Sequence, residues 1–172
     1  EASPMIVRNA TVNDARRIAE IKVAGWRAAY RGVMPDEVLD QLSVEEQTGK
    51  WRRRISDHPG RVLVADTNGA VNGYVSAAAS RDEDPQNPTV GEIYALYVFP
   101  DDWRHGVGSA LVAAALGVLR RQGFTLATLW VLVDNVSAIR FYQARGFQPD
   151  GRSKLENWGD ASLREIALAR VL

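Results

Sequence analysis

The chain has 172 residues, of which 46% are hydrophobic and 24% are charged, fractions that are typical of one globular domain and argue against disorder. Lysine plus arginine and aspartate plus glutamate both number 21, so we expect neither a nucleic acid nor a membrane as partner. The absence of cysteine excludes disulfide frameworks and a cysteine nucleophile, and with only two histidines we expect no metal site.

The N-terminal segment lacks the apolar core of a signal peptide, and no stretch approaches about 18 consecutive apolar residues. Together with the lack of cysteine, this favours a cytoplasmic protein. We expect residues 5–172 to form a single domain, and residues 1–4, which precede Met5, to be a remnant of cloning. No repeat, low-complexity linker or break in composition indicates a second domain.

The first half of the chain predicts a strand, several helices and a hairpin. Residues 5–10 are expected to form the strand, after which Thr11 and Asp14 approximate a capping box for a helix that ends near Tyr30. Trp26 lies on the apolar face of this helix, which favours a place in the core. Two shorter helices and two strands joined by an Asn-Gly turn follow, at about 35–43, 44–56, 61–66 and 70–79.

The second half predicts two strand–helix units and a final strand pair. After a polar loop at 81–88, a long strand is expected at 89–100, and regular alternation would place Glu92, Tyr94, Leu96 and Val98 on one face of it. A helix that ends at Gly123 comes next. The remaining elements are a strand buried on both faces, a short helix and two antiparallel strands, at 125–134, 135–146, 147–153 and 162–172.

The strand–helix–strand units require some parallel pairing, whereas the hairpins pair antiparallel. We therefore predict an α/β fold in which one mixed sheet carries helices on both faces.

The glycines of "RHGVGSALV" stand where a helix must begin. A helix start has free amide N–H groups and about half a positive charge, so it binds anions, and glycine lets a ligand approach the backbone. The dinucleotide and P-loop motifs both fail, because position 111 is leucine and no Gly-Lys-Ser/Thr occurs. Taken alone, the motif fits either a tight turn or an anion site.

Two longer segments carry a resemblance. "VFPDDWRHGVGSALV" resembles the acetyl-CoA-binding signature R/Q-x-x-G-x-G/A of the GNAT superfamily of N-acetyltransferases, except that Trp103 stands at the Arg/Gln position. "NVSAIRFYQARGF" resembles a second segment of that family at every fixed position, namely Asn135, Ala138, Phe141, Tyr142, Gly146 and Phe147. "RNATVNDARRIAEI" is similar to the family's opening strand and capped first helix.

The resemblance implies a single-domain GNAT-like fold, with a mostly antiparallel sheet that splays at the cofactor site. It implies acetyl-CoA as co-substrate and no metal. The pantetheine arm would pair with the backbone of Leu96 and Val98, and of Tyr97. The pyrophosphate would lie on the amides from Arg104 to Ser109, that is Arg104, His105, Gly106, Val107, Gly108 and Ser109. Asn135 would be a helix cap, a contact to the cofactor, or both.

The chemistry that the resemblance implies is direct transfer of an acetyl group to an amine. At pH 7 only about one alkylamine in a thousand is neutral, so a base is needed. Glu92 would be that base, unless it is a strand-edge glutamate, and Tyr142 would protonate the leaving thiolate, unless it is a core aromatic. Acceptor specificity would come largely from the first helices, their connecting loop and the last strand pair. The candidate residues are Tyr30, Arg31 and Trp158, together with Tyr94.

The resulting expectation is an N-acetyltransferase that acts on a primary amine of a small molecule in a ternary complex. Two alternatives stay open, a protein N-terminal or lysine acetyltransferase and a non-catalytic CoA-binding regulatory module. GNAT-like proteins are often homodimers, but no segment of this chain identifies an interface.

Overall fold

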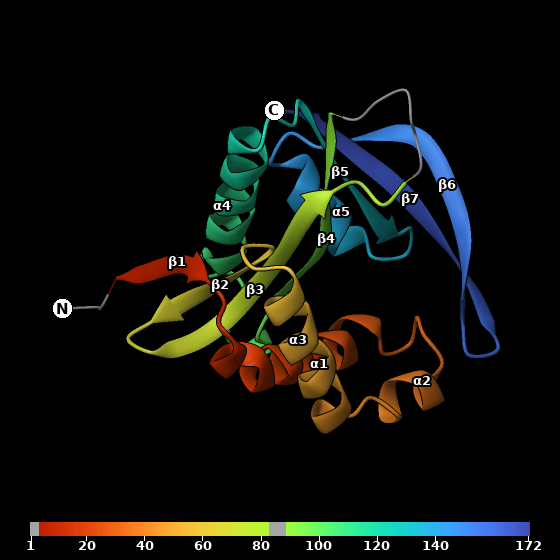
Figure 1. Ribbon diagram of the computed structural model, residues 1–172. Coiled ribbons are helices and arrows are strands. Elements are labelled where there is room, and N and C mark those ends of the chain that lie inside the picture. The colour runs from red at the N-terminus through yellow and green to blue at the C-terminus, as the bar shows by residue number, and fades with distance from the viewer. Residues whose placement is uncertain (1–3, 83–88) are drawn as a thin grey trace.

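Figure 1 shows the computed structural model, which describes residues 4–82 and 89–172. Most of the expected cloning remnant, residues 1–3, and most of the predicted polar loop, residues 83–88, lie outside the described residues. The predicted order was strand, two or three helices, three strands, helix, strand, helix and two strands, and the structure has this order with three helices after the first strand.

The strands form one seven-stranded sheet in the order β1-β2-β3-β4-β5-β7-β6. β4 and β5 are parallel, and every other neighbouring pair is antiparallel, which confirms the mixed, mostly antiparallel sheet. The Asn-Gly hairpin is also confirmed, because both of its turn residues adopt positive φ. The strand bounds are β1 Met5–Asn9, β2 Val62–Thr67, β3 Ala70–Ala79, β4 Val90–Val98, β5 Leu126–Leu132, β6 Gln148–Trp158 and β7 Ala161–Val171.

Helices cover both faces of the sheet, as predicted: α4 and α5 lie on one face and α1, α2 and α3 on the other (Figure 1). The helix bounds are α1 Ala15–Tyr30, α2 Asp36–Asp40, α3 Val44–Asp57, α4 Val107–Arg121 and α5 Val136–Gln143. Short 3₁₀ turns at Val12–Asp14 and Pro100–Asp102 precede α1 and α4. Among the described residues, no helix is long and apolar enough to cross a membrane.

Each face of the sheet has its own hydrophobic core. On the α4 face, Leu111 and Leu119 are fully buried against the strands, and on the other face Ile18 of α1 packs with Tyr74 of β3. Full burial of one such aliphatic side chain stabilises the fold by about 1.5–3 kcal/mol. The two cores fix the sheet between its helices and so fix the position of β4.

β4 contains a bulge that overturns one prediction. Ser76 pairs with Ala95 but Ala77 pairs with Ile93, which leaves Tyr94 as an extra residue. Leu96 and Val98 therefore pack into the core on the α4 face. Glu92 points to the opposite face, because a Cβ on Gly91 before it would meet Leu119 of α4 and Ile93 after it packs in the same core. The predicted common face for Glu92, Tyr94, Leu96 and Val98 is wrong, since alternation fails at a bulge.

The parallel contact between β4 and β5 is short. Pairing runs from Val90↔Leu126 to Glu92↔Thr128 and then stops, although β4 continues to Val98 and β5 to Leu132. Beyond Glu92 the two strands diverge (Figure 1). The predicted splay of the sheet is confirmed, and within residues 4–82 and 89–172 it leaves one edge of β4 without a strand partner from Ile93 onward.

Close packing of α4 on β3 yields a stability prediction. A Cβ on Gly73 would lie 2.9 Å from Leu111 Cδ1, 3.0 Å from Val107 Cγ1 and 3.2 Å from the Tyr97 carbonyl oxygen. Gly73→Ala should therefore lower the free energy of unfolding by about 1–3 kcal/mol through overpacking, measured by urea denaturation.

The matched control is Gly49→Ala in α3, where the nearest atom to a new Cβ is Arg53 Nη1 at 4.0 Å. There the same substitution should raise stability by about 1 kcal/mol, because alanine favours a helix interior. An equal effect of both changes would contradict the tight α4–β3 packing.

Candidate active site

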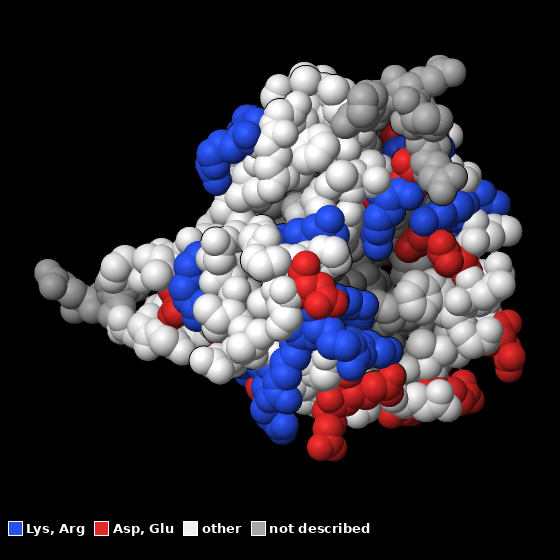
Figure 2. All heavy atoms as spheres, in the orientation of Figure 1, with Lys and Arg blue, Asp and Glu red and all other residues white. Residues whose placement is uncertain are grey.

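A cleft of about 1360 Å³ lies where β4 and β5 part. It runs from the start of α4 past the open edge of β4 to α1 and the β6–β7 hairpin. Figure 2 shows a hollow near the middle of the molecule, with Lys and Arg side chains gathered over α3 beside it. The volume is that of a pocket for a large ligand.

The start of α4 has the geometry of an anion site. Gly106 is its N-cap with φ of 83°, and Arg104 also adopts a left-handed φ of 66°. Such strain in a non-glycine residue is typical of functional loops. No atom of the described residues lies within 4 Å of a Cβ built on Gly106, whereas a Cβ on Gly108 would lie 3.1 Å from Phe141 Cζ. At Gly106 glycine thus permits the positive φ of the backbone, and at Gly108 it permits the close packing of α4 on α5.

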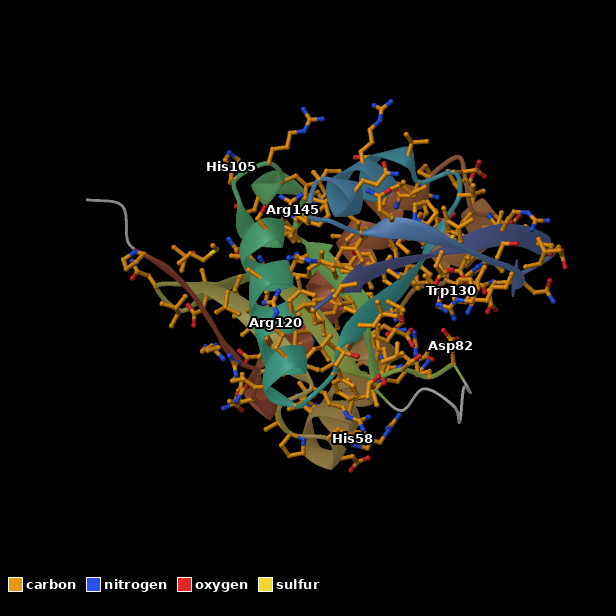
Figure 3. The ribbon with its side chains drawn as sticks, turned by 90° about the horizontal axis from the view of Figure 1, so that it is seen from above. His58, Asp82, His105, Arg120, Trp130 and Arg145 are labelled. Carbon is orange, nitrogen blue, oxygen red and sulfur yellow. The ribbon has the colours of Figure 1, made fainter. Side chains whose placement is uncertain are left out.

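Trp103 stands where the acetyl-CoA signature has Arg or Gln, and Arg145 lies near the same helix start. The Trp103 indole N–H donates to the Val98 carbonyl at 2.8 Å, so Trp103 covers part of the open edge of β4. Arg145 lies 3.7 Å over the Phe141 ring and donates to the Ser109 hydroxyl in the first turn of α4. Figure 3 shows Arg145 beside this helix. Arg145 therefore places a cation near the start of α4, where Trp103 provides none. This residue was not predicted from the sequence, where its only signal is that Arg145 follows the motif residue Phe141 by four positions.

Most residues predicted to hold the cofactor line the cleft: Leu96, Tyr97, Val98, Arg104, Gly106, Gly108, Ser109 and Asn135. Val107 and His105 do not. Val107 is buried in the core, and His105 is exposed just before the start of α4 (Figure 3). The predicted contact of these two residues with the pyrophosphate is through their backbone amides. The position of their side chains therefore does not test it, and it stays a prediction.

α5 presents Tyr142 to the cleft. The Asn135 side chain caps this helix by accepting from the Ala138 amide at 3.2 Å, which confirms the cap but leaves a cofactor contact untested. Tyr142 is 9% exposed and contacts the rings of Phe141 and Phe147 edge-on. Burial raises the pKa of Tyr142, which keeps its hydroxyl protonated at neutral pH.

An aromatic cluster forms the opposite end of the cleft. Trp26 of α1 contacts Tyr30 and Trp158 with ring centroids 5.5 and 5.1 Å apart, and the hydroxyls of Tyr30 and Tyr97 lie 3.3 Å from each other. Burial raises the pKa of both tyrosines. Trp26 was expected in the core, yet it is half-buried and lines the cleft.

Of the predicted acceptor residues, Tyr30, Tyr94 and Trp158 line the cleft, and Arg31 does not. Arg31 is exposed and forms ion pairs with Asp36 and Asp40 at 3.2 and 3.1 Å. These carboxylates of α2 hold it outside the cleft, so the structure does not bring Arg31 to the site.

Glu92, the predicted base, is only 1% exposed and does not line the cleft. Arg81 encloses its carboxylate: the Arg81 amide donates at 2.9 Å and its Nε at 3.2 Å. With a further bond from Arg81 Nη2, one neighbouring residue supplies three donors to a carboxylate that has about four acceptor positions.

Side chains from β5, β6 and β7 complete the site, and the sequence did not single them out. The Trp130 indole donates to the Asp82 carboxylate at 3.1 Å, Lys154 Nζ lies 4.3 Å from the Trp130 ring, and Glu165 stands nearby on β7. Figure 3 shows Asp82 and Trp130 together. These residues are far apart along the chain, and only the sheet order brings them to one cleft.

Comparison with known proteins adds a family match. The sequence model described as the acetyltransferase (GNAT) family matches residues 23–147. This range contains the bulged strand, the start of α4 and all of α5. The match therefore includes every element that lines the end of the cleft near Gly106.

Relatives of the chain include two curated bacterial proteins. An uncharacterized N-acetyltransferase, YuaI of Bacillus subtilis, is 33% identical over 94% of this chain and 90% of its own length. The mycothiol acetyltransferase of Sanguibacter keddieii is 40% identical over 51% of this chain, which spans 28% of that larger protein.

A solved structure has the same fold. The PaiA N-acetyltransferase of Thermoplasma acidophilum, in complex with coenzyme A, superposes with a TM-score of 0.76. The alignment covers 98% of this chain and 99% of that one at 17% sequence identity.

Proposed function

The chain belongs to the acetyltransferase (GNAT) family, and on that premise we propose that it transfers an acetyl group from acetyl-CoA to a primary amine of a small molecule by direct transfer in a ternary complex. The observation that carries the proposal is the open edge of β4, which begins where pairing with β5 ends after Glu92 and faces a cleft that reaches the start of α4.

The residues fit acetyl-CoA at both ends of its phosphate-linked arm. A pantetheine chain has amide groups that can pair with the backbone of Leu96 and Val98, which β5 does not pair with, although the Val98 carbonyl already accepts from Trp103. Free amides beside Gly106 and the Arg145 guanidinium suit a pyrophosphate. When bound, acetyl-CoA supplies the activated acetyl thioester, and the chain supplies binding, orientation and proton transfer.

Tyr142 is the proposed proton donor to the leaving sulfur. It lines the cleft on α5 and stays protonated at neutral pH, and no described residue forms a hydrogen bond with its hydroxyl. A free, protonated phenol beside the open edge of β4 is placed to donate to an acceptor atom in the cleft.

The aromatic end of the cleft is the proposed acceptor site. Trp26, Tyr30 and Trp158 offer ring faces and edges to a small apolar or cationic group. Such a lined pocket suits a compact amine better than an extended protein segment, which favours the small-molecule reading.

The proposed function is tested by free-CoA release across small amines, amino acids and peptides, with acetyl-CoA binding measured by calorimetry. We expect binding of acetyl-CoA and turnover on at least one small amine. Turnover on peptides alone would make the chain a protein acetyltransferase, and binding without turnover would favour a regulatory module. Failure to bind acetyl-CoA at millimolar concentration would contradict the donor site.

Tyr142→Phe should lower kcat by about 100-fold or more, because a general acid contributes about 10²–10⁴ to the rate, while acetyl-CoA affinity stays within about twofold. The matched control is Tyr74→Phe, which removes a fully buried hydroxyl that has no hydrogen-bond partner among the described residues. It should leave kcat unchanged. Equal rates for Tyr142→Phe and wild type would remove Tyr142 from the chemistry.

Arg145→Gln should weaken acetyl-CoA binding about tenfold, because a charge-assisted hydrogen bond is worth about 1.5–3 kcal/mol. S-acetyl-pantetheine lacks the pyrophosphate, so its kcat/KM should not change. The control is Arg140→Gln, which removes an exposed arginine of α5, the helix that ends just before Arg145. A loss of equal size for both donors would show that Arg145 acts on the fold and not on the phosphates.

A further inference from the structure

Glu165 is a carboxylate of the acceptor end that the predicted mechanism does not use. It lies on β7 opposite Leu132, the last residue of β5. Residues opposite each other in antiparallel strands point to the same face, and Leu132 packs with Trp26, Tyr30 and Trp158. Glu165 lines the cleft with a side chain that is 15% exposed. The sheet order therefore places this carboxylate beside the aromatic cluster.

Glu165 and Glu92 differ in what binds their oxygens. Glu92 accepts hydrogen bonds from the amide and guanidinium of Arg81. The one ion-pair partner that Glu165 has among the described residues is Lys154, with Nζ 3.8 Å from Oε2, beyond hydrogen-bond distance. Glu165 thus keeps acceptor capacity toward the cleft, whereas the oxygens of Glu92 are occupied.

The charges around Glu165 act in both directions. Burial is the largest effect and raises the pKa of its carboxyl, and the Glu156 carboxylate on β6 raises it further. Lys154 on β6 and Arg81 after β3 oppose this rise. The net effect is upward, toward the pH at which a carboxylate is an efficient base. Burial is the main cause that raises the pKa of the Tyr30 hydroxyl, and the Glu165 charge adds to that rise.

We propose that Glu165 binds the ammonium group of the acceptor and takes its proton, which makes Glu165 the base of the reaction. This inference rests on the proposed function, because it assigns the amine end of the same site. Its geometric basis is the juxtaposition of one accessible carboxylate with the aromatic rings of Trp26, Tyr30 and Trp158.

The proton balance is simple. The ammonium gives one proton to the Glu165 carboxylate, which returns it to solvent. The neutral nitrogen attacks the thioester carbon, so that the C–N bond forms and the C–S bond breaks. The sulfur gains the Tyr142 proton, and the second proton lost by the nitrogen restores the Tyr142 hydroxyl. The products are the acetamide and free CoA thiol.

The same arrangement defines the acceptor class as a primary ammonium on an aromatic or alkyl body. A cation beside Trp and Tyr faces gains about 0.5–2 kcal/mol, and the carboxylate adds a charged hydrogen bond. Phenethylamine is the simplest probe of this chemistry, since it carries one ammonium and one ring.

The kinetic test compares Glu165→Gln with Glu156→Gln, a neighbouring carboxylate on β6 that serves as control. We expect Glu165→Gln to lower kcat/KM for the amine by about 100-fold at pH 7 and to remove the acidic limb of the pH–rate profile, with acetyl-CoA affinity unchanged. Glu156→Gln should keep the limb and move it to lower pH, because the Glu156 charge raises the pKa of Glu165. An acidic limb that survives Glu165→Gln but disappears in Glu92→Gln would overturn the proposal.

A binding test stands apart from turnover. Phenethylamine is titrated calorimetrically into the protein saturated with CoA, and Glu165→Gln should weaken its binding about tenfold or more while Glu156→Gln does not. Equal binding by wild type and Glu165→Gln would overturn the assignment. A wild type that binds the amine through Glu165 but acetylates nothing would contradict the proposed function and leave this subsite supported.

Discussion

The early end of pairing between β4 and β5 is the constraint on which the site depends. β5 pairs along its whole length with β7 on its other edge, while β4 is held by β3 and by the core under α4. The two strands therefore stay together for only the pairs from Val90↔Leu126 to Glu92↔Thr128. Backbone N–H and C=O groups must find partners, so the edge of β4 that remains open in the middle of the sheet is the proposed binding surface. Trp103 meets part of that need through the Val98 carbonyl.

The bulge at Tyr94 then divides the site between the two faces of the sheet. It turns Leu96 and Val98 toward α4, and Ala95 and Tyr97 toward α1. The end of the cleft proposed for the donor thus lies beside α4 and α5, where Gly106 and Arg145 lie. The end proposed for the acceptor lies beside α1 and the β6–β7 pair. Strand β4 connects the two ends, so one strand aligns the proposed donor and acceptor.

The features that were predicted correctly are those that depend on residues close together in the sequence. The order of elements, the Asn-Gly turn, the Asn135 cap and the helix ends at Gly123 and Gly146 all follow from residues close together in sequence. The bulge could not be predicted, because it arises from the register that β4 adopts against β3. For the same reason the prediction that Leu96 lies on the same face of β4 as Glu92 was wrong.

The acceptor end shows the same limit more strongly. Trp26 has the spacing of a core residue, and it becomes a cleft residue only because β6 brings Trp158 against it. Glu165 lies in a strand whose residues alternate between apolar and polar and which contains no motif. Its proposed role depends on the neighbours that β5 and β6 bring beside it. β6 also runs to Trp158, beyond the predicted end at 153, since a bulge between Pro149 and Ser153 lets pairing resume. Motifs therefore predicted the donor end, and tertiary pairing determines the acceptor end.

Amide hydrogen exchange along β4 tests most directly the claim that its open edge is the donor site. With S-acetyl-pantetheine, which has the pairing arm but no pyrophosphate, exchange in residues 95–98 should slow about tenfold or more, while β2, paired on both edges, should not change. Unchanged exchange in residues 95–98 at a saturating concentration of S-acetyl-pantetheine would contradict the account.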